Sequence, residues 1–425
     1  MSVFAKATAS PSRSKRTLLS SLAIVGASAL VLAGCATDGG GTPSGDGGGD
    51  LSLKLGTALP VTGNLAFLGP PEIAATEYAA LQINEANAGI QIELIQGDSG
   101  DLDNKAYETE IPRLLNEDVS AILGAASSGV SLQFIDKVVG AGVIQFSPAN
   151  TSAVFTDYDD KGLYFRTAPS DVLQGEVLGN LIAADGNETL AMIVLNDSYG
   201  TGLAKYTQEA FEAAGGEVVA QPTYNTGDTT FDAQISEVLA ADPDAIALIT
   251  FEEVSTMLPS IVSSFPADKL YFVDGNLANF GDEFAPGTLV GAKGTLPGLS
   301  VDTIADFTTA VNEFYVGTGQ PALEGFSYAA ESFDSVILLA LASLAAGSTD
   351  PAAIAEKLQE VSGGSGNGEK CTTFADCADI INGGGVADYD GISGPISFDE
   401  LGDPTEAKIG IYQYGEDNTY SAYKG

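Results

Sequence analysis

From Leu51 onward, short apolar runs rich in β-branched residues alternate with longer stretches of helical periodicity. The apolar runs predict strands at 51–57, 91–96, 119–123, 143–146, 190–195, 245–250 and 270–273. The stretches between them predict helices that include 70–89, 104–116, 131–139, 173–183, 203–214, 231–240 and 254–263. Because parallel strands need a crossover connection, and this is usually a helix, the alternation indicates an α/β protein with mostly parallel, doubly wound sheets.

The stretch from Tyr328 to Leu344 is strongly apolar toward its C-terminal end, which raises the alternative of a membrane span. Glu331 and Asp334 lie in its first half, and the uncharged remainder is shorter than the roughly 20 apolar residues that a span needs. We therefore expect a helix that is buried in the body of the protein.

Histidine is absent from the 425 residues, and there are only three cysteines. The absence of histidine excludes a Ser-His-Asp triad, a Cys-His dyad and any His-ligated metal site. Three cysteines cannot supply a four-thiolate metal site. The chain also has no G-x-S-x-G elbow and no phosphate-binding G-x-x-x-x-G-K-[ST] loop. We expect neither a metal nor a cofactor.

The chain is strongly acidic, with 57 Asp and Glu against 17 Lys and Arg. Four of the basic residues lie in the first 34 residues, which contain no acid, so from Cys35 onward 57 acids face 13 bases and the net charge is −44. Such a charge argues against nucleic acid and anionic lipid as partners, because both require positive potential. Carboxylate pairs are abundant, and counting residues does not exclude a glycosidase, although no motif favours one.

The N-terminus has the pattern of a bacterial lipoprotein signal. Residues 1–17 are basic and rich in Ser and Ala, residues 18–33 form an apolar run too short for a membrane span, and Leu32-Ala33-Gly34-Cys35 matches a lipobox. We predict a signal peptide over 1–34, cleavage before Cys35 and a lipid on its thiol. The alternative is an ordinary secretory signal with an incidental cysteine.

Residues 35–50 are rich in glycine and show no hydrophobic periodicity. Such a linker is a flexible coil that spans on the order of 20 Å. We therefore expect a protein anchored by the lipid on Cys35 to the outer face of the cell membrane. In that oxidising setting, Cys371 and Cys377 of the segment CTTFADC most simply form a disulfide that closes a small surface loop.

Two loops that follow predicted strands carry small hydroxyl residues and free backbone N–H groups. They are Gly124-Ala125-Ala126-Ser127-Ser128-Gly129 and Ser147-Pro148-Ala149-Asn150-Thr151. Ligands of open α/β sheets bind beyond the carboxyl ends of the strands, and a helix N-terminus attracts negative charge. These loops are therefore candidates for holding a ligand carboxylate, although Ser and Thr are also ordinary helix N-caps.

An ordered series of segments resembles the leucine/isoleucine/valine-binding proteins, the amino-acid solute-binding proteins of ABC importers. The series is PVTG, ILGAASSGVS, FSPANTSAVFT, YFRTAPSDVLQG, NDSYGTGLA, TYNTGDTTFDAQI, PDAIALITFEE and YDGISGPISFDELGD. The resemblance covers 51–423, and the CTTFADC loop is similar to a feature of actinobacterial members. It implies a type I periplasmic binding fold of two lobes joined by a three-stranded hinge.

The same resemblance implies where the chain passes between the lobes, namely near Pro169, Leu299 and Asp388. Lobe 1 is then expected to comprise 51–169 and 299–388, and lobe 2 to comprise 170–298 and 389–425.

The resemblance also implies roles for individual residues. Ser128, Ala149 through its backbone, and Thr151 correspond to positions that hold the α-carboxylate of the ligand. Tyr199 of NDSYG corresponds to the aromatic residue that lies over the ligand. Asp274 is the best match for the acid that pairs with the α-ammonium group, because a buried ammonium needs an anion opposite it.

Several positions depart from the branched-chain pattern. Leu68 and Leu323 stand where aromatic walls are usual, and Phe251 replaces a tyrosine. Glu252 beside it offers a second acid, and Glu252 or Glu253 is the alternative partner for the ammonium group. A branched-chain or aliphatic amino acid is favoured as the ligand, while short amides or urea are the alternative.

The resemblance implies a non-enzymatic function. Two lobes close on a small ligand, and the closed form, a monomer, docks on an ABC permease. One rival hypothesis is a sensor of the same fold that signals to a receptor. Another is an extracellular hydrolase that uses paired carboxylates.

Overall fold

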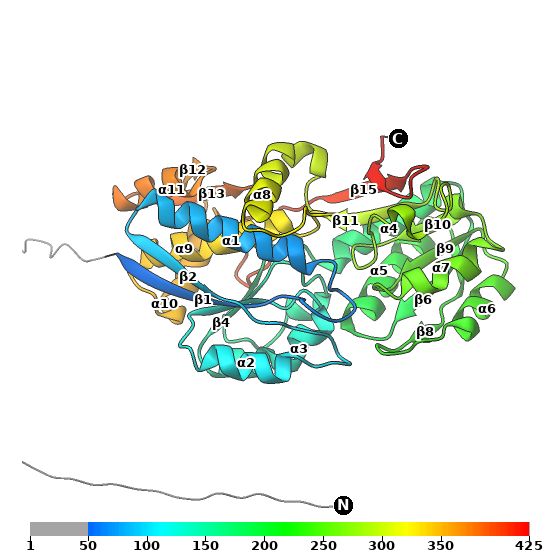
Figure 1. The fold of residues 1–425 in the computed structure, drawn as a ribbon, viewed down its shortest axis with the longest axis horizontal. Coiled ribbons are helices and arrows are strands. Elements are labelled where there is room, and N and C mark those ends of the chain that lie inside the picture. Colours follow the sequence, from blue (N-terminus) through cyan, green and yellow to red (C-terminus); the bar gives the residue numbers. More distant parts are fainter. Residues whose placement is uncertain (1–49, 425) are drawn as a thin grey trace, which may run out of the picture. The chain divides into compact units, whose positions relative to one another are not determined.

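The computed structural model describes residues 50–424, and the elements of this region are drawn in Figure 1. The predicted signal peptide 1–34, Cys35 and all but the last residue of the linker 35–50 lie outside the described residues. The described region contains two large sheets, each flanked by helices, and a small third sheet. We call the layers around the first large sheet lobe 1 and those around the second lobe 2.

The sheet of lobe 1 has five parallel strands in the order β2-β1-β3-β4-β5. Its strands are β1 (Leu51–Ala58), β2 (Ile90–Ile95), β3 (Ala121–Gly124), β4 (Ile144–Ser147) and β5 (Tyr164–Arg166). Its helices are α1 (Gly69–Ala86), α2 (Tyr107–Leu115), α3 (Ser128–Gly140), α8 (Ala305–Gly317), α9 (Ala329–Ala346), α10 (Pro351–Val361) and α11 (Phe374–Asn382). The predicted parallel sheet is confirmed.

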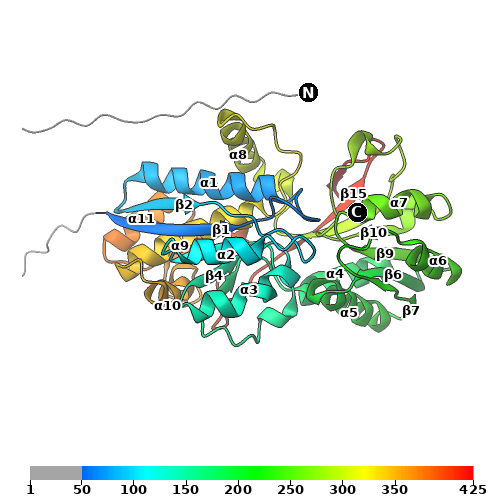
Figure 2. The same ribbon diagram turned by 60° about the horizontal axis from the view of Figure 1, so that its bottom comes forward.

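Side chains of the lobe 1 strands alternate between two apolar layers, as a pleated strand requires. Leu53 and Leu55 of β1 pack in the cluster that contains α1 and α9, whereas Ala58 and Ile122 pack in the cluster that contains α2 and α3. Figure 2 shows α1 on one side of this sheet and α2 and α3 on the other. Both faces of the sheet are therefore covered, which explains why its strands read as continuous apolar runs.

The apolar helix predicted from Tyr328 onward is α9, and it lies inside lobe 1. Among the described residues, α9 alone is long and apolar enough to meet the length and composition criteria of a membrane span, but 83% of it is buried. It packs between α1 and α10. The prediction of a buried core helix is confirmed.

The sheet of lobe 2 has the order β16-β15-β11-β10-β9-β6-β7, and β8 also pairs with β6. Its strands are β6 (Thr189–Leu195), β7 (Glu217–Ala220), β8 (Thr223–Tyr224), β9 (Ala245–Ile249), β10 (Leu270–Phe272), β11 (Lys293–Pro297), β15 (Ile409–Tyr414) and β16 (Tyr420–Ala422). The two C-terminal strands run antiparallel to their neighbours, and the other pairs are parallel.

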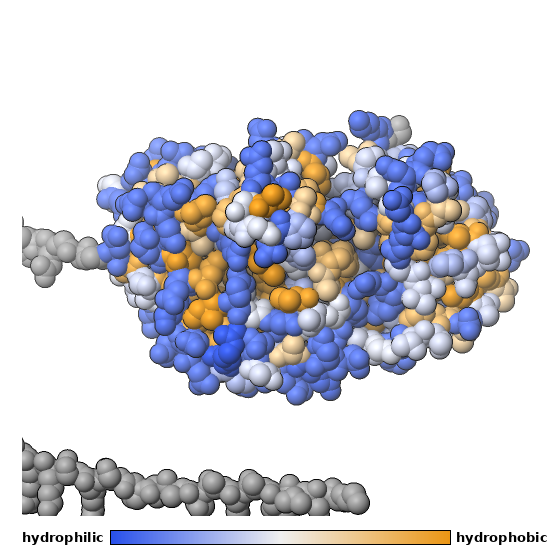
Figure 3. All heavy atoms as spheres, viewed as in Figure 1, coloured by the Kyte–Doolittle hydropathy of each residue, from blue (hydrophilic) through white to orange (hydrophobic). Residues whose placement is uncertain are grey.

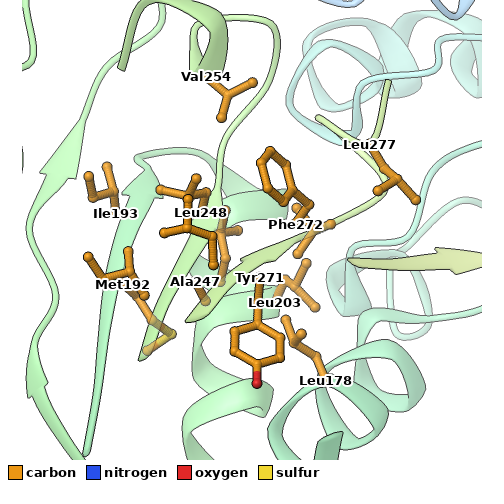
Figure 4. Close-up of a cluster of buried hydrophobic side chains, with 14 of the residues drawn as sticks. Leu178, Met192, Ile193, Leu203, Ala247, Leu248, Val254, Tyr271, Phe272 and Leu277 are labelled. Atoms are coloured by element: carbon orange, nitrogen blue, oxygen red, sulfur yellow. The ribbon is translucent and has the colours of Figure 1, made fainter. Parts of the chain in front are cut away.

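Four helices flank this sheet: α4 (Asp171–Ala184), α5 (Ser198–Ala213), α6 (Asp232–Ala240) and α7 (Val254–Val262). Figure 4 shows part of the core, in which Leu248 of β9 lies between Ile193 of β6 and Phe272 of β10, while Leu178 and Leu203 approach from α4 and α5. This core fixes the strand ends that face lobe 1.

Connections between the two lobes occur at three places. The first joins β5 to α4, and the second follows β11. The third was expected near Asp388, and beyond that position Tyr389, Ile396 and Phe398 still pack with α9 in lobe 1. Buried Arg166 then holds Asp403 through an ion pair of 2.6 Å, so the packing favours a crossing between Asp403 and Ile409.

The predicted disulfide between Cys371 and Cys377 is present. It joins β12 (Glu369–Cys371) to α11, beside β13 (Ala387–Gly391) and β14 (Gly394–Pro395). The loop that it closes lies at the surface, as expected, because Thr372, Thr373, Ala375 and Asp376 are exposed. Both cysteines, by contrast, are buried in the apolar cluster of lobe 1. The link therefore ties α11 into the core.

The boundaries of the helices follow local hydrogen bonding. The predicted helix 104–116 begins only at Tyr107, because the Asp101 carboxylate accepts bonds from the backbone N–H groups of Asp103 and Asn104 and closes a separate turn.

Hydrophilic residues cover much of the face seen in Figure 3, in keeping with the acidic composition.

Candidate functional site

A small cavity lies between the two lobes, beyond the carboxyl ends of β3 and β4 in lobe 1 and of β9 and β10 in lobe 2. We call it the inner cavity, and its lining residues are Leu65, Leu68, Ala126, Ser127, Ser128, Ala149, Tyr199, Phe251, Asp274, Gly275 and Tyr328. This is where ligands bind in open α/β sheets. The two loops singled out from the sequence therefore do meet at one cavity.

One end of the inner cavity is built by the N-terminus of α3. The Ser127 hydroxyl caps this helix by accepting a bond from the N–H of Val130 at 3.3 Å, and the Ser128 hydroxyl accepts from the N–H of Ser152 at 3.2 Å. Free N–H groups and the helix dipole make this end favourable for an anion.

The loop after β4 is held against the loop after β3 by buried polar groups. Ser147 donates its hydroxyl proton to the carbonyl of Ala125 at 2.7 Å, and the Asn150 amide donates to the carbonyls of Ala125 and Ala126 at 3.0 and 2.8 Å. These bonds fix Ala149 at the cavity wall.

Thr151 lies near the inner cavity but does not form part of its wall. It is buried, and its carbonyl accepts a bond from the N–H of Asp171 at 2.7 Å. Its predicted role toward a ligand carboxylate stays a prediction.

The other end of the inner cavity is acidic. The carboxylate of Asp274, which is 4% exposed, accepts bonds from the hydroxyls of Tyr199 at 2.7 Å and Tyr328 at 2.6 Å, and from the Gln174 amide at 2.9 Å. Burial raises the pKa of Asp274, while the three donors oppose that rise. The donors come from both lobes, so Asp274 lies at their junction.

Two aromatic rings of lobe 2 cover the cavity. Tyr199, in the first turn of α5, stacks on Phe251 with ring centroids 5.3 Å apart and planes inclined by 18°. The Tyr199 hydroxyl is committed to Asp274, and Phe251 has no hydroxyl to offer. This wall is therefore apolar toward the cavity.

The glutamates considered as alternatives to Asp274 do not line the inner cavity. Glu252 is exposed. Glu253 is half-buried and accepts bonds from the Asn64 amide at 2.8 Å and the Tyr224 hydroxyl at 3.3 Å, which makes it a contact between the lobes.

Sequence reasoning did not single out Tyr328, and it named Leu323 as a position where an aromatic wall is usual. Leu323 lies outside the inner cavity, whereas Tyr328 lines it. Tyr328 precedes α9 and has a left-handed backbone with φ of 59°, a conformation that is uncommon for a bulky residue. This backbone directs the phenol across to Asp274, and no sequence pattern signals such a conformation for a tyrosine.

Asp171 was also missed, because at the start of α4 it reads as an ordinary helix-capping acid. It is fully buried, and burial first, then the charge of Asp274, raise its pKa well above the ordinary value. The Thr151 side chain approaches this carboxylate, yet neither oxygen has a well-formed hydrogen bond within residues 50–424. Two buried carboxyl groups therefore stand near each other at the acidic end.

The inner cavity is narrow as it stands. Only about 10 Å³ is available to the centre of a water molecule, which is close to the minimum for holding one water. An amino acid would enter only if the lobes separated. The bonds that join the lobes include Tyr328 to Asp274, Asn64 to Glu253, and the Asn279 amide to the carbonyl of Glu324 at 2.9 Å.

Within residues 50–424, no three Cys, Asp or Glu side chains gather in a metal-binding arrangement. The groups that line the inner cavity give it one end that favours an anion and one acidic end.

Comparison with known protein families shows to which family the chain belongs. The sequence pattern of the family described as Periplasmic binding protein matches residues 52–376, which is most of the chain. The chain belongs to the periplasmic binding protein family. That family consists of binding proteins, which agrees with the predicted non-enzymatic function.

Relatives of this periplasmic binding protein span nearly its whole body. It is similar to Leu/Ile/Val-binding protein homolog 2 of Brucella abortus, with 25% identity over 381 residues that cover 88% of this chain and 93% of the relative. It is also similar to the chemotactic signal transduction system substrate-binding protein BasB of Halobacterium salinarum, with 24% identity over 358 residues, 81% of this chain and 83% of the relative.

Solved structures share its architecture. The crystal structure of the branched-chain amino acid transporter substrate-binding protein LivJ from Streptococcus pneumoniae, in complex with isoleucine, superposes with a TM-score of 0.66. The superposition covers 88% of this chain and all of LivJ at 22% identity. The predicted two-lobed type I periplasmic binding fold is thereby confirmed.

Proposed function

We propose that the protein is an extracytoplasmic solute-binding protein that captures an amino acid between its two lobes and delivers it to an ABC permease. The observation that carries this proposal is the polarity of the inner cavity. A helix N-terminus with the Ser128 hydroxyl lies at one end, and Asp274 lies at the other. That is the charge distribution that complements a zwitterion.

A buried ligand ammonium group needs an anionic partner in the protein. No Lys or Arg lines the inner cavity, so Asp274 has neutral donors around it but no cation among the lining residues. A ligand ammonium would supply the missing positive charge. Ser128, the backbone of Ala149, and Thr151 are proposed to hold the carboxylate.

The names of relatives favour a branched-chain or aliphatic amino acid. The Brucella protein is named for leucine, isoleucine and valine, and LivJ was solved with isoleucine. The apolar wall of Leu68, Tyr199 and Phe251 suits such a side chain. Short amides or urea remain the alternative ligands, since they would use the same hydrogen-bonding groups without the ammonium pairing.

Transport would follow from hinge closure. The lobes close around the ligand about three connections, and closure changes the surface that the permease reads. Only the ligand's differential affinity for the closed form shifts the equilibrium, so contacts from both lobes are needed. Tyr328 from lobe 1 and Tyr199 from lobe 2 both line the inner cavity, so a ligand bound there would contact both lobes.

A binding panel tests the proposal. The mature chain with Cys35→Ser, which cannot be acylated, is titrated by calorimetry and thermal shift with the twenty amino acids, short amides and urea. We expect aliphatic amino acids to raise the melting temperature with one site per monomer. If no amino acid raises it at saturating concentration, the amino-acid proposal is wrong, and binding of urea alone would favour the alternative.

Anchoring is a separate part of the proposal and rests on the lipobox at Cys35 and the linker 35–50. The expected result is that the native protein fractionates with the membrane and that Cys35→Ser releases it into the medium. Retention of the variant in the membrane fraction would contradict a lipid on Cys35.

A sensor of the same fold is the second candidate, and the similarity to BasB, which is named for chemotactic signal transduction, favours it. Uptake of labelled ligand distinguishes the two. Deletion of the protein should abolish high-affinity uptake in an importer, whereas a sensor mutant would take up the ligand normally and lose only the response.

A further inference from the structure

A second and larger cavity adjoins the inner one, and we call it the outer cavity. About 390 Å³ of it is available to the centre of a water molecule, and its lining includes Phe67, Leu68, Pro71, Leu277, Leu323 and Tyr315. Leu68 lines both cavities. The other walls continue as well, because Ser327 of the outer cavity adjoins Tyr328 of the inner one.

The outer cavity is apolar inside and polar at its mouth. Leu68 and Leu277 are buried, and Phe67, Tyr315 and Leu323 are partly buried. Gln320, Asn279 and Glu324, which also line it, are exposed. An apolar group that entered from the inner cavity would therefore exchange water for carbon contacts along most of its length.

The wall of the outer cavity is shared between the lobes. The segment 318–327, between α8 and α9, supplies one side from lobe 1, and Leu277 and Asn279 supply the other from lobe 2. The Asn279 amide donates to the carbonyl of Glu324 at 2.9 Å, and its carbonyl accepts from the N–H of Tyr420 at 3.1 Å. Closure of the lobes therefore completes both cavities together.

The sizes of the two cavities decide how a ligand would lie. The inner cavity has the polar groups that suit a zwitterionic head group. With about 10 Å³ for the centre of a water molecule, it admits that head group only when the lobes separate, and it has no spare volume for a long side chain. The outer cavity has the volume and the apolar walls but no buried charge among its lining residues. Each cavity therefore suits one half of a large apolar amino acid.

We propose that the ligand's side chain passes Leu68 into the outer cavity, so that the site selects amino acids with a large apolar or aromatic side chain over alanine or valine. This inference rests on the proposed function, because it assumes that the head group lies between Ser128 and Asp274. Within that function it assigns Leu68 as the residue that divides the head-group site from the side-chain site.

The first test is a size series. Dissociation constants of the full mature chain with Cys35→Ser are measured by calorimetry for alanine, valine, leucine, phenylalanine and tyrosine. Phenylalanine is expected to bind at least about tenfold more tightly than alanine, as burial of the larger apolar surface predicts. Equal or tighter binding of alanine would overturn the inference.

The second test closes the passage. Leu68→Trp should lower the ratio of phenylalanine to alanine affinity by about tenfold or more, because the indole would occupy the entrance to the outer cavity. The control is Leu81→Trp, which makes the same replacement on an exposed position of α1 and should leave the ratio unchanged. A Leu68→Trp protein that keeps the wild-type ratio contradicts the inference.

If Leu68→Trp fails to show a cooperative melt, Leu323→Trp decides instead. Leu323 is partly buried and lines only the outer cavity of the two, so this indole fills the side-chain site without touching the head-group site. The same loss of the ratio is expected. A wild-type protein that binds no amino acid rejects the proposed function itself, whereas binding without a preference for size rejects only this inference.

Discussion

Asp274 receives hydrogen bonds from Tyr199 and Gln174 on lobe 2 and from Tyr328 on lobe 1. A carboxylate placed in this way has two functions to perform, since it joins the lobes and offers an anion to a ligand. Substitutions at Asp274 and at its donors separate these functions.

Asp274→Asn keeps the size of the side chain and removes its charge. Amino-acid binding is expected to weaken by about 2 to 5 kcal/mol, because the ligand ammonium loses its buried partner. Calorimetry measures the affinity, and a thermal melt shows that the fold survives. Glu252→Gln, at an exposed acid, is the matched control and should bind normally. Normal binding by Asp274→Asn would instead direct attention to Glu253.

Tyr328→Phe removes the hydroxyl that reaches Asp274 and keeps the ring. Loss of one donor to a buried carboxylate should cost about 1 to 3 kcal/mol of folding stability in urea unfolding. The control is Tyr389→Phe, whose hydroxyl donates to buried Asp334 at 2.7 Å within lobe 1. Both variants should lose stability, but only Tyr328→Phe should change ligand affinity. Equal affinity in the two variants would show that Tyr328 is purely structural.

At the scale of secondary-structure elements, the link between β12 and α11 is the clearest stabilising feature of the described C-terminal part. Cys371 and Cys377 are six residues apart, so the loop that they close is short. In the chain-entropy account, a loop of this size contributes about 2 kcal/mol.

The double variant Cys371→Ala, Cys377→Ala should therefore unfold at lower urea concentration than the wild type. Reductant should produce a similar loss in the wild type and none in the variant. A variant that is as stable as the wild type would show that packing of α11 in lobe 1, and not the covalent link, provides the stability.

Elements of this type were largely predictable from the sequence, because periodicity and strand-helix alternation are local signals. The strand predicted at 190–195 is β6 (Thr189–Leu195), and the helix predicted at 254–263 is α7 (Val254–Val262). The loops after β3 and β4 were predictable for the same reason. Residues whose position depends on distant contacts were not.

Tyr328 and Asp171 illustrate the limit of sequence reasoning for the site. The left-handed backbone of Tyr328 is stabilised by a partner 54 positions earlier in the chain, and Asp171 is buried by elements of both lobes. The residues next to Tyr328 and Asp171 in the sequence do not predict either environment. The packing of Phe398 is a similar case, since it contacts aromatic residues such as Phe146 that are remote in sequence.

At the scale of the whole molecule, acidic residues occur in the interior as well as on the surface. Glu72 of α1 and Glu331 of α9 are both buried, and burial raises the pKa of Glu331 to about 8. The pKa of Glu72 is also raised, first by burial and then by the charge of Glu331. α1 and α9 pack against each other, and in the folded protein burial favours the protonated form of both carboxyl groups.

The sign of the resulting pH dependence follows from linkage. The ordinary pKa of a glutamate is 4.5, and that of Glu331 in the folded protein is about 8. Between these two pH values the folded state therefore binds the proton of Glu331 more tightly than the unfolded chain does. The stabilisation is complete below pH 4.5 and is lost as the pH rises through about 8. We expect the melting temperature to fall between pH 5 and 9, and Glu331→Gln to flatten that fall. An unchanged slope in the variant would assign the effect to other carboxyl groups.

Lobe 1 is assembled from two distant parts of the chain, since α1 ends at Ala86 and its packing partner α9 begins only at Ala329. The strands from β6 to β11, by contrast, are contiguous between Thr189 and Pro297. During synthesis or translocation, the central part of lobe 2 therefore has all its strands before lobe 1 receives the helix that covers its sheet. Until then the face of α1 that packs against α9 has no partner and is open to aggregation. The order in which the chain emerges thus makes lobe 1 the late and vulnerable half of a newly made molecule.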